Sequence, residues 1–129
     1  MVETVPGWKL DIRQIGEWLC VRITGPRQDD TELDACMSRL WTIVQKRQAY
    51  WLVLELDELK RLTSPVIGHL IRLEQQLTLQ GGLLRLSGLS PQLQDVLNTF
   101  VSRLERRFRC YPNREVALRS EDAPAPGAA

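Results

Sequence analysis

The sequence predicts an α/β fold in which amphipathic helices pack on a mixed β-sheet of four to five strands. Stretches with the two-residue period of a strand alternate along the chain with stretches that have the period of a helix. One stretch, 50–56, is almost continuously apolar, which is typical of a strand covered on both faces. The chain has 129 residues, of which 43% are hydrophobic, enough for the core of one domain.

The first third of the chain predicts an antiparallel hairpin followed by a helix. Apolar and polar residues alternate over 8–14 and again over 18–24, with Gly16 in the turn between them. A helix is expected over 30–47, because acidic residues at its start suit the positive end of the helix dipole. Its apolar residues recur at the helical spacing. They are Leu33, Cys36, Met37, Leu40, Ile43 and Val44.

The rest of the chain alternates strands with helices. Ser64-Pro65 and Ser90-Pro91 both predict a helix start, with serine as the cap and proline as the first helical residue. Gly81 stands where a left-handed residue usually ends a helix. The expected elements are strands at 50–56 and 83–87, helices at 64–80 and 91–107, a short strand at 109–111 and a final helical turn at 114–119.

Residues 1–120 are expected to form a single domain, and 121–129 a disordered tail rich in Pro, Ala and Gly. The formal net charge of +1 gives no electrostatic footprint for nucleic acid or an anionic membrane. The chain has no apolar run of the length that crosses a bilayer and no apolar start of the kind a signal peptide needs. We therefore expect a cytoplasmic protein that neither enters membranes nor binds nucleic acid directly.

The cysteines and the histidine predict neither a metal site nor a cofactor site. The 3 cysteines are far apart and His69 is the sole histidine, so a Cys/His zinc site is not available. Cys20 and Cys36 fall within apolar patterns and are expected in the core. His69 follows Ser64 by five positions near the start of one helix, a poor spacing for a nucleophile and its base. It is expected on the helix surface.

No other pattern predicts catalysis. No glycine-rich phosphate loop follows a strand. Asp57 and Glu58 are adjacent after the central strand, so their carboxylates are expected to point apart as solvated loop acids rather than to work as an acid/base pair. No catalytic residue is predicted, and an enzyme is the least favoured interpretation.

The start of the second helix is the best candidate for a site. Thr63 and Ser64 precede Pro65 after the central strand, at the end of an open α/β sheet where sites collect. In one interpretation Ser64 caps the helix by accepting a backbone N–H, worth about 1 kcal/mol. In the other it is a regulatory hydroxyl, because a helix N-terminus tolerates the charge of a phosphate well. The two interpretations are compatible.

Residues 51–97 resemble the STAS domain of anti-sigma factor antagonists. That family has an apolar strand, a short link, a helix start, an amphipathic helix ending in Gly-Gly, a strand and a second helix start. The corresponding segments are WLVLELDELKRL, TSPVIGHLIRLEQQL, LQGG, LLRLSGLS and PQLQDVL. WLCVRITG and YPNREVAL extend the resemblance more weakly to roughly 8–120.

The resemblance implies a mixed sheet with helices and a role in partner switching. The unmodified antagonist would bind an anti-sigma factor that is also a serine kinase and so free the sigma factor. Phosphorylation at the start of the second helix would break the complex, and a phosphatase would restore it. Ser64 falls on the phosphoacceptor position, Thr63 is an alternative acceptor on a position usually acidic, and Gly68 matches a family glycine. The implied partner-binding surface is Thr63, Ser64, Pro65, Gly68 and His69.

Two alternatives lie within the same family. One is a STAS subunit of a membrane-transport assembly, which would be marked by a stable transporter partner. The other is a small-molecule or lipid-sensing STAS domain, which requires an internal apolar cavity.

Overall fold

A single six-stranded sheet organises the chain, with its strands in the order of the sequence, β1-β2-β3-β4-β5-β6. The computed structural model describes residues 1–25, 28, 30–103 and 108–119. The elements are β1 (Val2–Val5), β2 (Trp8–Ile15), β3 (Trp18–Thr24), η1 (Asp30–Glu32), α1 (Leu33–Arg47), β4 (Trp51–Glu55), α2 (Ser64–Leu79), β5 (Leu83–Ser87), α3 (Pro91–Ser102), β6 (Arg109–Tyr111) and α4 (Arg114–Arg119).

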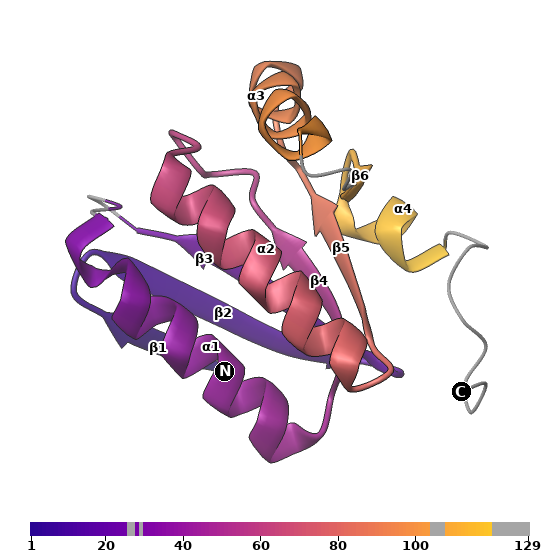
Figure 1. Cartoon of the computed structure of the whole chain (residues 1–129). Coiled ribbons are helices and arrows are strands. Elements are labelled where there is room, and N and C mark those ends of the chain that lie inside the picture. Colours follow the sequence, from indigo (N-terminus) through magenta and orange to yellow (C-terminus); the bar gives the residue numbers. More distant parts are fainter. Residues whose placement is uncertain (26–27, 29, 104–107, 120–129) are drawn as a thin grey trace.

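The sheet is mixed. β1, β2 and β3 pair antiparallel, whereas β3, β4, β5 and β6 pair parallel. Each parallel pair is joined through a helix, and α1 and α2 lie side by side across one face of the sheet (Figure 1). This arrangement places the beginnings of α1, α2 and α3 at the edge of the sheet where the parallel strands end.

The large core lies between the sheet and its helices. Alternate residues of β2, β3, β4 and β5 enter it, and Leu10 of β2 and Leu54 of β4 are among those that are buried. Leu70 of α2 and Leu97 of α3 belong to the same cluster. Cys36 of α1 is also buried in it, as predicted.

The opposite face carries a smaller core beneath α4, in which Cys20 is buried as predicted. Arg85 of β5 is fully buried there and donates a hydrogen bond to the carbonyl oxygen of Ala117 in α4. The Arg85 guanidinium carbon lies 4.8 Å from the ring centre of Trp18 and 5.2 Å from that of Tyr111. The hydrogen bond therefore ties α4 to this face, while cation–π attraction to Trp18 and Tyr111 stabilises the buried guanidinium.

The predicted α/β class and mixed sheet are confirmed, but the predicted number of strands was wrong. The sheet has six strands because β1 was missed, a four-residue edge strand with no buried side chain and hence no clear apolar alternation. The first predicted turn of α1 is the 3-10 helix η1. Gly81 has the expected left-handed backbone, with φ of 73°.

Two sequence predictions reach beyond the part of the chain that the structure describes. α3 ends at Ser102, and 104–107, expected in the same helix, lie outside the described residues. The predicted tail, 121–129, lies outside them as well. Among the described residues, no helix combines the length and the apolar character needed to span a membrane.

Candidate functional site

The candidate site lies where β3, β4 and β5 end. The segment after β3, the loop 56–63 after β4 and the loop 88–90 after β5 lead from this edge into α1, α2 and α3 (Figure 1). Carboxyl ends of parallel strands commonly form binding sites, because loops and helix starts converge there.

The cap of α2 is Thr63, so the interpretation of Ser64 as the cap was wrong. Thr63 has an extended backbone, with φ of −83° and ψ of 163°, and its side-chain oxygen accepts a hydrogen bond from the Val66 N–H at 3.4 Å. Ser64 is the first helical residue. Leu62 and Ile67, on either side of the cap, are both buried in the large core. These are the positions of a hydrophobic staple, a spacing in the sequence that identifies the cap as Thr63.

The matching prediction for α3 is confirmed. Ser90 has an extended backbone and accepts a hydrogen bond from the Leu93 N–H at 3.3 Å, with Pro91 as the first helical residue. The two Ser-Pro pairs therefore occupy different positions in their helices. The proline is the first helical residue in α3 and the second in α2.

Three of the predicted surface residues share one exposed face of α2. Ser64, Pro65 and Gly68 are all exposed, and spacings of three and four residues place them together on a helix. At Gly68 an added Cβ would have nothing within 4 Å, so open space lies over this part of the helix. Ser64 therefore lies on an exposed part of the helix, one turn before this open space.

The other two predicted residues, Thr63 and His69, join α2 to the start of the preceding helix. The Thr63 hydroxyl donates a hydrogen bond to Asp30 Oδ1 at 3.1 Å. His69 Nε2 lies 2.7 Å from Asp34 Oδ1, and its side chain is 18% exposed because it sits at the contact between α1 and α2. The expectation of a plain surface histidine was therefore incomplete. Sequence reasoning missed both aspartates, because their partners lie more than thirty positions away.

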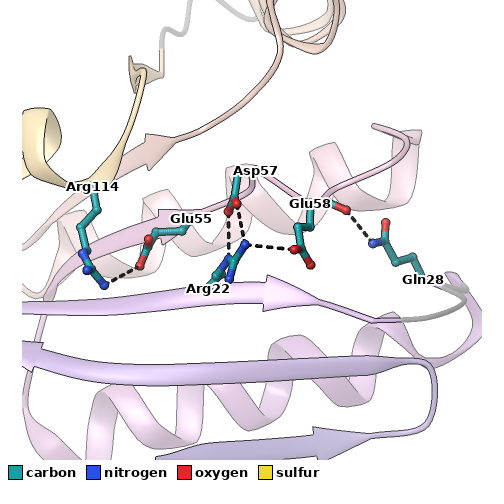
Figure 2. A network of polar contacts seen from close by, with 6 residues as sticks. All are labelled: Arg22, Gln28, Glu55, Asp57, Glu58 and Arg114. Carbon is teal, nitrogen blue, oxygen red and sulfur yellow. Dashed lines mark hydrogen bonds and ion pairs between the residues drawn. The ribbon is translucent and has the colours of Figure 1, made fainter.

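Arg22 of β3 binds the two acids that follow β4 (Figure 2). Its Nε and Nη2 donate to the two carboxylate oxygens of Asp57 at 3.1 and 2.7 Å, and Nη2 also donates to Glu58 Oε1 at 3.0 Å. The expectation that Asp57 and Glu58 point apart was wrong, because this cation draws both toward itself. The hydrogen bond from Arg22 also lowers the pKa of Asp57, which favours an ion pair over a general acid.

Gln28 is a second link between the same loops. Its side chain is buried, and its Nε2 donates to the Glu58 carbonyl at 2.9 Å (Figure 2). Its Oε1 accepts from the Lys60 N–H at 3.0 Å. The loop after β5 packs directly on the loop after β4. A Cβ added at Gly88 would lie 2.7 Å from the Asp57 Cβ. Gln28 and Gly88 thus each contact the loop after β4.

The arrangement offers a binding surface with an exposed hydroxyl. Among the described residues, no group of three His, Cys, Asp or Glu side chains is placed to hold a metal ion. Burial raises the pKa of Cys20 to about 11 and that of Cys36 to about 12, so these thiols stay protonated at neutral pH. An apolar cavity between the sheet and the two covering helices, lined in part by Trp8 and Leu70, has a volume of about 20 Å³. It has room for about one water molecule, so it does not favour lipid sensing.

A family model for the STAS domain matches residues 9–117, and the chain belongs to this family. The resemblance seen in the sequence is thereby confirmed. A comparison with curated protein sequences found no match.

Several solved structures share the fold. A proposed anti-sigma factor antagonist from Thermotoga maritima is 13% identical with a TM-score of 0.70, over 84% of this chain and 91% of that one. A variant of RsbS from Moorella thermoacetica is 17% identical with a TM-score of 0.68, over 84% and 91%. The phosphorylated form of the Bacillus cell-fate determinant SpoIIAA is 14% identical with a TM-score of 0.63, over 84% and 96%.

Proposed function

We propose that this STAS domain is an anti-sigma factor antagonist-like regulatory module of a bacterial partner-switching pathway. It binds an anti-sigma factor that is also a serine kinase, through the exposed start of α2. The observation that carries the proposal is the placement of Ser64, an exposed residue that begins α2 at the edge where Gln28 and Gly88 contact the loop after β4. The fold shared with a proposed anti-sigma factor antagonist and with phosphorylated SpoIIAA supports it.

Phosphorylation at Ser64 is compatible with this fold. The γ-phosphoryl group of ATP would pass to Ser64 Oγ, the hydroxyl proton would be released and ADP would leave. Hydrolysis would return the serine and inorganic phosphate. The start of α2 accommodates the product, because free backbone N–H groups and the helix dipole both favour an anion there.

Ser64 is a better acceptor than Thr63. The Thr63 oxygen already accepts the Val66 N–H, and its proton is donated to Asp30. A phosphoryl group on Thr63 would displace that proton and place two anions in contact, whereas Ser64 is open to solvent. The geometry therefore supports Ser64 as the phosphoacceptor and Thr63 as the cap of α2.

The switch is tested by comparing Ser64→Ala with Ser64→Asp. The alanine variant should bind the kinase-like partner like the unmodified protein, whereas the aspartate variant should lose about 2–4 kcal/mol of binding free energy through a charge buried unpaired at the interface. Calorimetry with the cognate partner measures both affinities. Ser38→Asp, on an exposed position of α1, controls for the change in net charge. Equal affinities for the two Ser64 variants would rule out a charge switch at this residue.

The surface itself is tested by Gly68→Gln. Replacing an exposed glycine inside a helix should raise stability by about 0.5–1 kcal/mol, since nothing obstructs the new side chain. The same side chain would project from the proposed surface and should weaken partner binding at least tenfold. Gln75→Ala, an exposed change farther along α2, is the control. Undiminished binding by a well-folded Gly68→Gln variant would place the partner elsewhere.

A further inference from the structure

The 3-10 helix η1 is weakly anchored beside the proposed phosphoacceptor. None of its three residues is buried, and Glu32, which precedes α1, makes no side-chain cap hydrogen bond. Among the described residues, the side-chain contact that ties η1 to α2 is the 3.1 Å hydrogen bond from Thr63 to Asp30. A segment held in this way responds readily to a change of charge at the contact.

The same hydrogen bond brings a carboxylate next to Ser64. Thr63, the residue that binds Asp30, directly precedes Ser64, and the Cα atoms of consecutive residues are about 3.8 Å apart. A phosphoryl group would add about 1.5 to 2 negative charges within the screening length of the solution. The nearby cation Arg22 is already held by Asp57 and Glu58.

The cap of α2 does not depend on Asp30. Thr63 stabilises α2 by accepting the Val66 N–H on its oxygen, and it contacts Asp30 through its proton. Repulsion between a phosphate and Asp30 would therefore break the link to η1 while leaving the start of α2 in place.

We infer that Asp30 transmits phosphorylation of Ser64 to η1: the phosphate repels the Asp30 carboxylate, breaks its hydrogen bond with Thr63 and releases the segment. The inference rests on the proposed function in taking Ser64 as the phosphoacceptor. A partner then meets two differences in the phosphorylated protein, a new charge on α2 and a released segment before α1.

The test uses the full chain with phosphoserine incorporated at position 64 during synthesis. Hydrogen exchange of the Thr31, Glu32 and Leu33 amides should accelerate at least fivefold on phosphorylation, with little change in the amides of α2. In Asp30→Asn, which keeps an oxygen for the Thr63 hydroxyl, the acceleration should fall below twofold. Asp34→Asn removes a carboxylate that contacts His69 instead, and it should respond like the unmodified sequence.

A second measurement reports the contact directly. In a ³¹P NMR titration, the second pKa of the phosphoserine should be higher with Asp30 present than in Asp30→Asn, because a neighbouring anion disfavours the dianion. The inference would be overturned if hydrogen exchange at η1 did not change on phosphorylation, which is the result expected if Arg61 neutralised the phosphate. It would also be overturned if the exchange rates responded equally with Asp30 and with Asn at position 30. Because no kinase is needed, these outcomes are separate from the partner-binding test of the proposed function.

Discussion

At the start of α2, two adjacent hydroxyls have different surroundings and hence different roles. Thr63 is half-buried and bonded on both sides, to the backbone of its own helix and to Asp30. Ser64 is exposed to solvent. A one-residue shift of the cap would exchange these surroundings, so the positions of the apolar residues Leu62 and Ile67 decide which of the two hydroxyls is exposed.

This division predicts a clear difference in stability. Thr63→Ala should lower the free energy of unfolding by about 1 kcal/mol, because the Val66 N–H loses its acceptor. Ser64→Ala should change it by less than about 0.5 kcal/mol, the usual range for an exposed site. Urea denaturation measures both, and Thr63→Ser, which keeps a hydroxyl to accept the Val66 N–H and to donate to Asp30, should stay close to the unmodified protein. A larger loss for Ser64→Ala would contradict the assignment of the cap.

At the scale of elements, β3 and the loop after β4 are coupled through Arg22 and Asp57. The Asp57 side chain is 44% exposed, so the ion pair should contribute about 0.5 kcal/mol after solvent screening. Because the pKa of Asp57 is lowered in the folded state, this contribution is present above the unfolded pKa of about 3.9 and is lost as pH falls through the lower folded value.

The corresponding prediction concerns Asp57→Asn. The variant should be less stable than the unmodified protein at pH 7, and the difference should shrink as pH falls below the unfolded pKa of Asp57 and disappear once Asp57 is protonated in the folded state as well. Denaturation curves at a series of pH values measure it. A difference that persists at the lowest pH would show that the variant disturbs packing rather than the ion pair.

The contact between the loops after β4 and β5 depends on Gly88. This residue has φ of 80°, and an added Cβ would press on the Asp57 Cβ at 2.7 Å. Gly88→Ala should therefore destabilise the protein by about 1–3 kcal/mol. Gly68→Ala, where the added methyl meets nothing within 4 Å, should be neutral or stabilising in the same thermal unfolding assay. Similar behaviour of the two variants would contradict the close packing of these loops.

Periodicity predicted most of the elements because burial follows it. The apolar run of β4 and the helical stripe of α2 lie where the pattern placed them, since both face the core. β1 has no buried residue, so its pairing with β2 left no pattern to find. The contacts of Asp30 with Thr63 and of Arg22 with Asp57 could not be predicted from the sequence for another reason. They join residues more than thirty positions apart, and tertiary contacts of this kind leave no local signal.

Across the whole molecule, the two faces of the sheet are covered by different means. Apolar packing of α1 and α2 covers one face, whereas the short helix α4 depends on a buried cation for its place on the other. A buried arginine is tolerated here because Trp18, Tyr111 and the Ala117 carbonyl all face its guanidinium.

Loss of that cation should weaken the second face as a unit. Arg85→Ala should lower the free energy of unfolding by about 2–4 kcal/mol and shift Trp18 fluorescence toward longer wavelength as α4 loosens. Thermal unfolding and emission spectra measure the two effects. Arg13 of β2 is aligned with Arg85 across the sheet, because Arg13 pairs with Cys20, Cys20 with Val53, and Val53 with Arg85. Arg13 is exposed, so Arg13→Ala is the matched control and should change neither the stability nor the Trp18 emission. An unshifted spectrum in Arg85→Ala would show that α4 is held by its other contacts.

The order of the strands in the sheet has a consequence for how the chain folds. Every strand pairs with its neighbours in the sequence, from β1 at one edge to β6 at the other. Each strand therefore pairs with a segment that is close in the sequence. Forming each pair closes only a hairpin turn, or one crossover helix with its loops, so the loss of chain entropy is modest. Chains with such local connectivity fold faster than those whose strands interleave. The sheet can therefore grow outward from the β2–β3 hairpin, and refolding should be rapid for a domain with four parallel strands.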